Sequence, residues 1–309
     1  MSPTHKLSSR DLWMLALLTV SWGVNWPVMK IGVADFAPMT FRTLSMAGGI
    51  AVLWLIVQVQ GNSLRVPREH WGELLRLGFF NMVVWFILAI YGVKLLSSGR
   101  AAILGYTLPI WTALWGIVLF GDHPTRRLWI GVSAAAVGVA LLLGSEFSHI
   151  AGRPLGTVCM LGAAIVWGYG THLMRRRKQK TSVQVITFWS LTQSVIICTI
   201  VAVVLEHDQW TRLPNSAESW AIAYNSIVIF GFSQVMWFRL ATILPPVASG
   251  LSVMLIPVTG VFAGIWMLGE QPVWQDYAAL VSILLAIATV LLPARSTKTP
   301  VAQSAKRVG

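Results

Sequence analysis

Ten long apolar runs constrain this chain more than any other feature of its sequence. A helix needs roughly 20 apolar residues to cross the hydrocarbon core of a bilayer, and each run is close to that length. Strands of a membrane barrel would be shorter and would alternate apolar with polar residues. The sequence therefore predicts an all-α integral membrane protein with ten transmembrane helices. The predicted spans are 11–32, 38–59, 71–95, 99–120, 127–145, 154–174, 183–205, 217–240, 245–268 and 274–293.

The composition agrees with this prediction. Hydrophobic residues make up 56% of the 309 residues and charged residues only 11%, whereas a soluble protein carries roughly 25% charged residues. This excludes an ordinary soluble enzyme, a disordered protein and a secreted disulfide scaffold, and it makes the lipid bilayer the predicted partner. Cys159 and Cys198 lie inside apolar runs without a metal-binding or redox spacing. The first run follows Lys6 and Arg10 like a signal peptide, but it is too long for one and we expect it to be retained.

The basic residues predict an orientation. The net charge of +12 lies in short gaps between apolar runs, not on a folded basic domain, so no nucleic-acid partner is expected. With a cytoplasmic N-terminus, most of the 23 lysines and arginines fall on the cytoplasmic side, as the positive-inside rule requires. Segments 1–10 and 294–309 are then cytoplasmic, and a bacterial inner membrane is the expected location. The cations of the opposite side are Lys30, Arg42, Lys94, Arg100, Arg153 and Arg212.

The two halves of the chain resemble each other. Trp22-Gly23 recurs as Trp167-Gly168, and Leu108-Pro109-Ile110 recurs as Ile256-Pro257-Val258. Four more pairs match at the spacing of 148 residues that separates Leu108 from Ile256. They are Gly116 with Gly264, Gly121 with Gly269, Asp122 with Glu270, and Pro124 with Pro272. We therefore expect two repeats, 11–145 and 154–293, of five spans each. Because five is odd, the second repeat enters the membrane from the opposite side, the arrangement of many secondary transporters that work by alternating access.

The same segments resemble a known family. Ser98-Gly99-Arg100-Ala101-Ala102-Ile103-Leu104, Pro109 to Leu114 and Gly121-Asp122 are similar to the EamA branch of the drug/metabolite transporter superfamily. Ser21-Trp22-Gly23 and Trp167-Gly168 fit the same pattern. The resemblance covers all ten spans and implies an inverted five-plus-five repeat and export of amino acids or related metabolites. The functional group it suggests is the aromatic amino acid exporter (YddG-like) type.

Polar side chains within the spans are candidates for contacting a substrate. The clearest are the amides Asn25, Asn81, Gln193 and Gln234, which can bind the amino or carboxylate group of a solute. Each amide can equally bond a neighbouring helix, and we expect at least one of the four to line the cavity.

Aromatic residues lie beside two of these amides. Trp85 follows Asn81 by one helical turn and Trp22 precedes Asn25 by three residues, so each pair shares a helix face. Trp167 and Tyr106 are further candidates, although packing is an alternative role for every one. An amide beside an aromatic wall suits a zwitterion with an apolar side chain.

Two prolines and one histidine suggest moving parts. Pro109 and Pro257 occupy equivalent places in spans 4 and 9, where symmetric kinks would let both helices bend as gates or would be static. His172 is a candidate proton relay. Close helix packing explains the small-residue face of Gly260 and Gly264, so a monomer is expected.

Several absences narrow the function. All acidic residues fall at or near span ends, which favours facilitated export over coupling to protons or sodium. No Walker A loop, HExxH or Asp-rich motif occurs, so we expect neither a cofactor, a metal nor enzymatic activity. A nucleotide-sugar or sugar-phosphate carrier is an alternative, but it needs cations deep in the cavity. An intramembrane lipid-modifying enzyme and a channel rank lower. Outer-end Lys30, Arg42 and Arg100 would attract carboxylates or simply extend to the interface.

Overall fold

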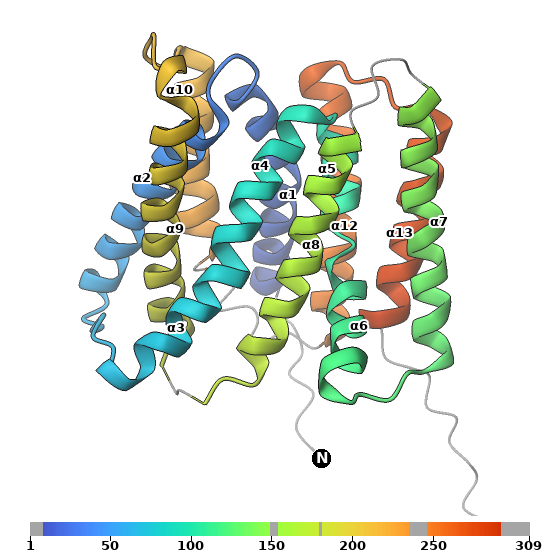
Figure 1. Ribbon diagram of the computed structural model, residues 1–309, viewed down its shortest axis with the longest axis horizontal. Coiled ribbons are helices and arrows are strands. Elements are labelled where there is room, and N and C mark those ends of the chain that lie inside the picture. Colours follow the sequence, from blue (N-terminus) through green and yellow to red (C-terminus); the bar gives the residue numbers. More distant parts are fainter. Residues whose placement is uncertain (1–8, 149–153, 179–180, 235, 237–245, 292–309) are drawn as a thin grey trace, which may run out of the picture.

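The protein is a bundle of helices. The computed structural model describes residues 9–148, 154–178, 181–234, 236 and 246–291, and within these residues it contains helices and no strand. Figure 1 shows the long helices running side by side between an upper and a lower face. The longer elements are α1 Ser9–Gly32, α2 Pro38–Val59, α3 Trp71–Gly78, α4 Val84–Leu95, α5 Ser98–Gly105, α6 Leu108–Phe120, α7 Arg126–Ser148, α8 Pro154–Arg175, α9 Val183–Glu206, α10 Ser216–Tyr224, α12 Pro246–Leu268 and α13 Trp274–Leu291.

Seven helical segments of the described residues are long and apolar enough to cross a membrane. They are Leu12–Gly32, Pro38–Val59, Arg68–Leu95, Ser98–Phe120, Arg126–Gly144, Pro154–Arg175 and Val183–Gln209. These segments match the first seven predicted spans closely. The ninth and tenth predicted spans correspond to the shorter apolar helices Val253–Leu268 and Trp274–Thr289. Part of the eighth, and the tails 1–8 and 292–309, lie outside the described residues.

The surface of the bundle confirms a multi-pass membrane protein. On α9, the side chains of Ile196, Ile200, Val203 and Val204 are all exposed, and they repeat at the spacing of one helix face. Trp266 on α12 is 86% exposed. A water-facing surface would not present such a continuous apolar stripe, so this face contacts lipid.

The helices that should form spans 3 and 8 have the same unusual structure. In span 3, α3 passes into the π-helical segment η2, Phe79–Val83, before α4 begins. In span 8, α10 passes into the π-helical segment η4, Asn225–Ser233. A π-segment widens the turn and removes some backbone hydrogen bonds from the ordinary register, and such segments are frequent at functional sites.

The two candidate gating prolines lie in different local structures. Span 4 is broken: α5 ends at Gly105, and Pro109 lies in the first turn of α6, where a missing N–H costs little. Pro257 instead lies inside the continuous helix α12. The expected pair of symmetric kinks is therefore replaced by one break and one proline within an unbroken helix.

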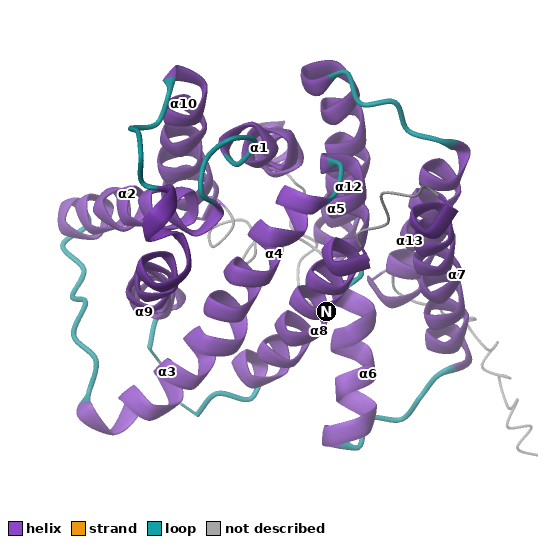
Figure 2. Ribbon diagram, turned by 45° about the horizontal axis from the view of Figure 1, so that its top comes forward, coloured by secondary structure: helices purple, strands orange, loops and turns teal. Residues whose placement is uncertain are grey.

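Helices from the two halves of the chain pack against each other throughout the bundle. The main contacts join α1 to α12, α4 to α8, α2 to α9, α6 to α8 and α7 to α13. Figure 2 shows α7 and α13 together at one edge, with α2 and α9 at the opposite edge. Two glycines permit close approach at equivalent contacts: a Cβ on Gly23 would lie 2.4 Å from Thr259 of α12, and one on Gly168 would lie 2.8 Å from the backbone nitrogen of Thr112 in α6.

Candidate functional site

The upper face is held together by acidic side chains at helix N-termini. Glu206, the last residue of α9, is only 2% exposed. Its carboxylate accepts hydrogen bonds from the backbone N–H groups of Met39 and Thr40, both at 2.9 Å, and from the Thr40 hydroxyl at 3.0 Å. Helix α2 has no capping side chain of its own, because its N-cap residue is Ala37. Glu206 therefore satisfies the free N–H groups of a helix from the other half and matches its positive end.

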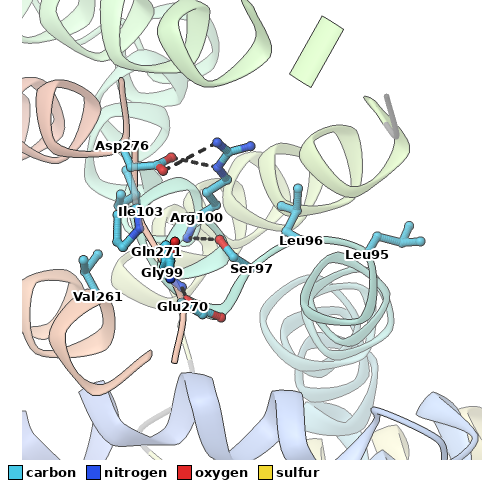
Figure 3. A pocket seen from close by; sticks show the side chains of 11 residues that line it. Leu95, Leu96, Ser97, Gly99, Arg100, Ile103, Val261, Glu270, Gln271 and Asp276 are labelled. Carbon is cyan, nitrogen blue, oxygen red and sulfur yellow. Dashed lines mark hydrogen bonds and ion pairs between the residues drawn. The ribbon is translucent and has the colours of Figure 1, made fainter. Parts of the chain in front are cut away.

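A second carboxylate accepts hydrogen bonds from the backbone N–H groups at the N-terminus of α5. Glu270, in the loop after α12, accepts from the backbone N–H groups of Ser98 at 2.6 Å and Gly99 at 3.2 Å. Beside it, Arg100 donates to Asp276 at 2.7 Å. These groups line a pocket of about 260 Å³ between α5 and the α12–α13 loop, and Figure 3 shows Arg100 directed at Asp276 across it. The pocket is thus bordered by an ion pair and a capped helix end that both join the two halves.

Two lysines of the upper face cap helix C-termini. Lys30 of α1 donates to the carbonyl oxygens of Val93, Lys94 and Leu96, at 2.7 to 3.0 Å. Lys94 of α4 in turn donates to the carbonyl oxygens at the end of α1, including that of Ala34 at 2.8 Å. Each cation lies at the negative end of the neighbouring helix. Lys30 therefore does not extend to the interface as a free charge.

Arg42 departs from the sequence expectation. An arginine near a span end usually extends its charged head to the interface, but Arg42 is only 2% exposed. Its guanidinium lies 5.1 Å from the centre of the Phe86 ring on α4 and donates to the Met29 sulfur on α1. Arg42 is thus a buried cation inside the bundle.

The candidates Asn81, Trp85 and Trp167 lie together on one seam. Asn81, in η2, is buried and donates through Nδ2 to the Gly170 carbonyl of α8 at 2.9 Å and to Leu77 at 3.1 Å. The Trp85 ring of α4 meets the Trp167 ring of α8 at 5.0 Å between centroids. An amide and two half-buried indoles therefore line the contact between α4 and α8, one helix from each half.

The other candidates lie on different seams. Tyr106, at the break between α5 and α6, meets the Trp26 ring of α1 at 6.3 Å, edge to face. Gln193 of α9 lies against Gly78 of α3, and its Oε1 is buried without a hydrogen-bond partner. The Oδ1 atom of Asn25 on α1 is also buried without a partner. Trp22 and Gln234 are half-buried.

The candidate relay His172 is buried near the lower end of α8. Its Nε2 lies 2.7 Å from the carbonyl oxygen of Thr112 in α6, and it donates a hydrogen bond there because a carbonyl oxygen can only accept one. Its ring stacks on Phe120 at 4.8 Å. The side chain thus also joins α8 to α6.

Asn225 is the residue that sequence reasoning missed. It is fully buried in η4, its Nδ2 donates to the Ala221 carbonyl at 3.0 Å, and its Oδ1 is buried without a partner. Asn81 makes the same bond to the carbonyl four residues before it. Asn225 follows Asn81 by nearly the spacing of the sequence repeat, and that spacing was the signal available to find it.

The lower face has an open groove. It measures about 700 Å³ and is lined by the end of α2, the loop after it, Trp71 and Trp189. The two indoles meet edge to face at 4.9 Å, and Trp189 donates to the Leu64 carbonyl at 2.9 Å. The groove therefore lies at the edge of the bundle, where α2, α3 and α9 meet.

The described residues contain no group of His, Cys, Asp and Glu suited to a metal ion. In the loop before α10, Arg212 forms a two-bond ion pair with Glu218, with both distances at 2.6 Å. This hydrogen-bonded pair raises the pKa of Arg212. Cys159 and Cys198 are free thiols.

Comparisons with known proteins agree with the helical architecture. The sequence profile of the EamA-like transporter family matches residues 10–144 and again residues 154–292. The chain is 24% identical over 264 residues to the uncharacterized transporter YoaV of Bacillus subtilis, covering 84% of this chain and 89% of that protein. It is 24% identical over 301 residues to the uncharacterized inner membrane transporter YedA of Escherichia coli K12, covering 94% and 95%. One solved crystal structure shares the fold with a TM-score of 0.66 at 17% identity, covering 93% of this chain and 99% of that one.

Proposed function

The chain belongs to the EamA-like transporter family, and from this premise we propose that it is a secondary transporter that exports amino acids, aromatic ones among them, or related small metabolites. Ten spans form two inverted repeats of five, and the solute site between them opens to each side in turn. The transport is facilitative, and the protein works as a monomer.

The observation that carries this proposal is the equivalence of contacts in the two halves. Gly23 of α1 meets Thr259 of α12, and its repeat partner Gly168 of α8 meets Trp111 and Thr112 of α6. Such pairs are expected when two like bundles are related by a pseudo-two-fold axis in the membrane plane.

The helix ends after these contacts support the same relation. Gly121 and Gly269 both have a positive φ, of 71° and 64°. After Gly121, Asp122 donates its backbone N–H to the carbonyl oxygen of Gly116. After Gly269, Glu270 donates in the same way to the carbonyl oxygen of Gly264. The turns that follow α6 and α12 are thus built alike.

The site that we assign to the solute lies on the seam between α4 and α8. Trp85 and Trp167 offer indole faces that suit an apolar or aromatic side chain, and Asn81 lies one turn away. Acidic groups buried near the spans, such as Glu206, already accept hydrogen bonds from protein groups, which supports a facilitative mechanism over proton coupling.

The orientation is part of the proposal. Most lysines and arginines of the sequence lie on the lower side, and the positive-inside rule then makes the lower face cytoplasmic, with both termini in the cytoplasm. On the opposite, upper face, Glu206 and Glu270 join the two halves.

Counterflow in proteoliposomes across a panel of amino acids tests the function. We expect exchange of at least one amino acid without a pH or sodium gradient. Exchange that vanishes when these gradients are removed would refute the facilitative mechanism, and no exchange of any amino acid would refute the substrate class.

Substitutions on the seam test the site. Trp85→Ala and Trp167→Ala should each lower the exchange rate severalfold at normal expression, because each removes one wall of the site. Trp13→Ala is the matched control, since Trp13 is 77% exposed at the lower end of α1. Full activity in both seam variants would show that the site lies elsewhere.

A further inference from the structure

We propose that Arg42 binds the carboxylate of the transported solute and so determines that this protein accepts acids and zwitterions over amines. The proposal rests on the proposed transport function and names the group on which its selectivity depends.

The guanidinium of Arg42 is buried with an incomplete set of hydrogen-bond partners. Its Nε atom has no acceptor, and its Nη2 donates to the Met29 sulfur at 2.9 Å. A thioether is a weak acceptor, and the Phe86 ring offers only its π-face. Burial of a cation is costly without a charged or strongly polar partner, so the geometry points to an acceptor that arrives from outside the chain.

The surroundings of Arg42 lie between the two halves of the protein. Phe86 also meets the Phe230 ring of η4 at 5.5 Å. Ser45, three residues after Arg42 on the same helix face, accepts at its carbonyl a hydrogen bond from Ser226 of η4 at 3.0 Å. Figure 2 shows α2, α9 and α10 on the left side of the molecule, with α1 and α4 next to them towards the centre. A group held by Arg42 would therefore contact both halves, as a solute in alternating access must.

The charge balance favours a carboxylate over a phosphate. A phosphate monoester carries a charge of about −1.5 to −2 at neutral pH and needs more than one cation. The other cations of the upper face in the described residues are occupied: Lys30 and Lys94 by carbonyl oxygens, Arg100 by Asp276 and Arg212 by Glu218. One guanidinium fork matches one carboxylate.

A pair of solutes that differ in the carboxylate tests the proposal by transport. We would measure counterflow of phenylalanine and of phenethylamine, which lacks the carboxylate, in Arg42→Gln and Arg42→Lys. Arg42→Gln should lower phenylalanine exchange by about tenfold or more, the loss expected for a charge-assisted hydrogen bond. Phenethylamine, which the unchanged protein should exchange more slowly than phenylalanine, should be exchanged at the same rate by Arg42→Gln. Arg42→Lys should keep part of the phenylalanine exchange. Arg68→Gln is the control, because it removes an exposed cation from the lower face.

A binding measurement keeps the test independent of transport. In detergent, phenylacetate should raise the melting temperature of the unchanged protein more than phenyl phosphate does, and phenethylamine should raise it least. Arg42→Gln should abolish this rise and Arg42→Lys should reduce it. This result would support the proposal even if no amino acid is exchanged, in which case only the proposed transport function fails.

Three results would overturn the proposal. Equal losses of phenylalanine and phenethylamine exchange in both Arg42 variants would show that Arg42 serves only structure. A melting temperature that phenylacetate does not raise, or raises equally in Arg42→Gln, would show that no carboxylate binds there. If Arg42→Gln does not fold, Arg42→Lys and the three probes on the unchanged protein decide, and a larger rise with phenyl phosphate contradicts the carboxylate.

Discussion

At the scale of single residues, the charged side chains near the membrane surface hold helix ends. Glu206 and Glu270 both cap helices of the first half from positions in the second half. A carboxylate at a helix N-terminus accepts hydrogen bonds from N–H groups that have no partner in the helix and also interacts favourably with the helix dipole. These two acids therefore link the halves at the upper face.

Removing the Glu206 carboxylate should destabilise the protein. Glu206→Ala leaves two backbone N–H groups of α2 unpaired, at a cost of about 1–3 kcal/mol, and Glu206→Gln should fall between it and the unchanged protein. The measurement is the melting temperature in detergent. Glu69→Ala is the control, because the Glu69 side chain is 78% exposed. A Glu206→Ala protein as stable as Glu69→Ala would contradict the capping role.

The turn after α12 gives a second prediction at this scale. Gly269 has a φ of 64°, a conformation that costs a side-chain-bearing residue about 1–2 kcal/mol, so Gly269→Ala should lower the melting temperature. Gly144 lies in α7 with open space around its Cα, and Gly144→Ala should be neutral or gain up to about 1 kcal/mol. Equal melting temperatures for the two variants would refute the interpretation.

At the scale of elements, spans that look uniform in sequence have interruptions at corresponding places. The π-segments η2 and η4 follow short α-helices, and each buries an asparagine that bonds the carbonyl four residues earlier. A π-segment frees backbone groups that polar side chains then satisfy. Both segments lie within the helix bundle, where such groups are shielded from lipid.

The contact between α8 and α6 tests element packing. Gly168→Ala would place its Cβ 2.8 Å from the Thr112 nitrogen and 2.9 Å from the Trp111 carbonyl carbon, and a backbone cannot move aside as a side chain can. We expect a loss of about 1–3 kcal/mol from overpacking and less folded protein on size-exclusion chromatography. Gly162→Ala on the same helix meets only the Leu88 side-chain end at 3.2 Å and should be tolerated. Equal behaviour of the two variants would contradict the close contact.

At the scale of the whole molecule, the open question is which face of the bundle lies in the cytoplasm. Single cysteines at Ser63 on the lower face and Gln209 on the upper face, both exposed, can report the orientation once Cys159 and Cys198 are changed to Ala. In intact cells an impermeant maleimide should label Gln209→Cys and should reach Ser63→Cys only after lysis. Labelling of Ser63→Cys from outside would reverse the proposed topology.

Much of the fold could be predicted from the sequence because lipid imposes a strict requirement on it. Every spanning segment must satisfy its own backbone hydrogen bonds and expose apolar side chains, so the first seven spans were located to within a few residues. Site prediction was harder. Asn81, Trp85 and Trp167 meet on one seam, but Tyr106 and Gln193 lie on others, because periodicity gives the face of a helix and not the helix opposite it.

The sequence by itself determined that this chain spans a membrane many times and repeats its pattern, since hydropathy and recurring glycines act locally along the chain. Only the tertiary structure decided that Arg42 is buried while other cations cap helix ends, and that span 4 breaks before Pro109 while α12 stays continuous. The reason is physical: the environment of a charge or a proline depends on which helices pack beside it. Residues on other helices make those contacts, such as Phe86 for Arg42 and Val93 for Lys30.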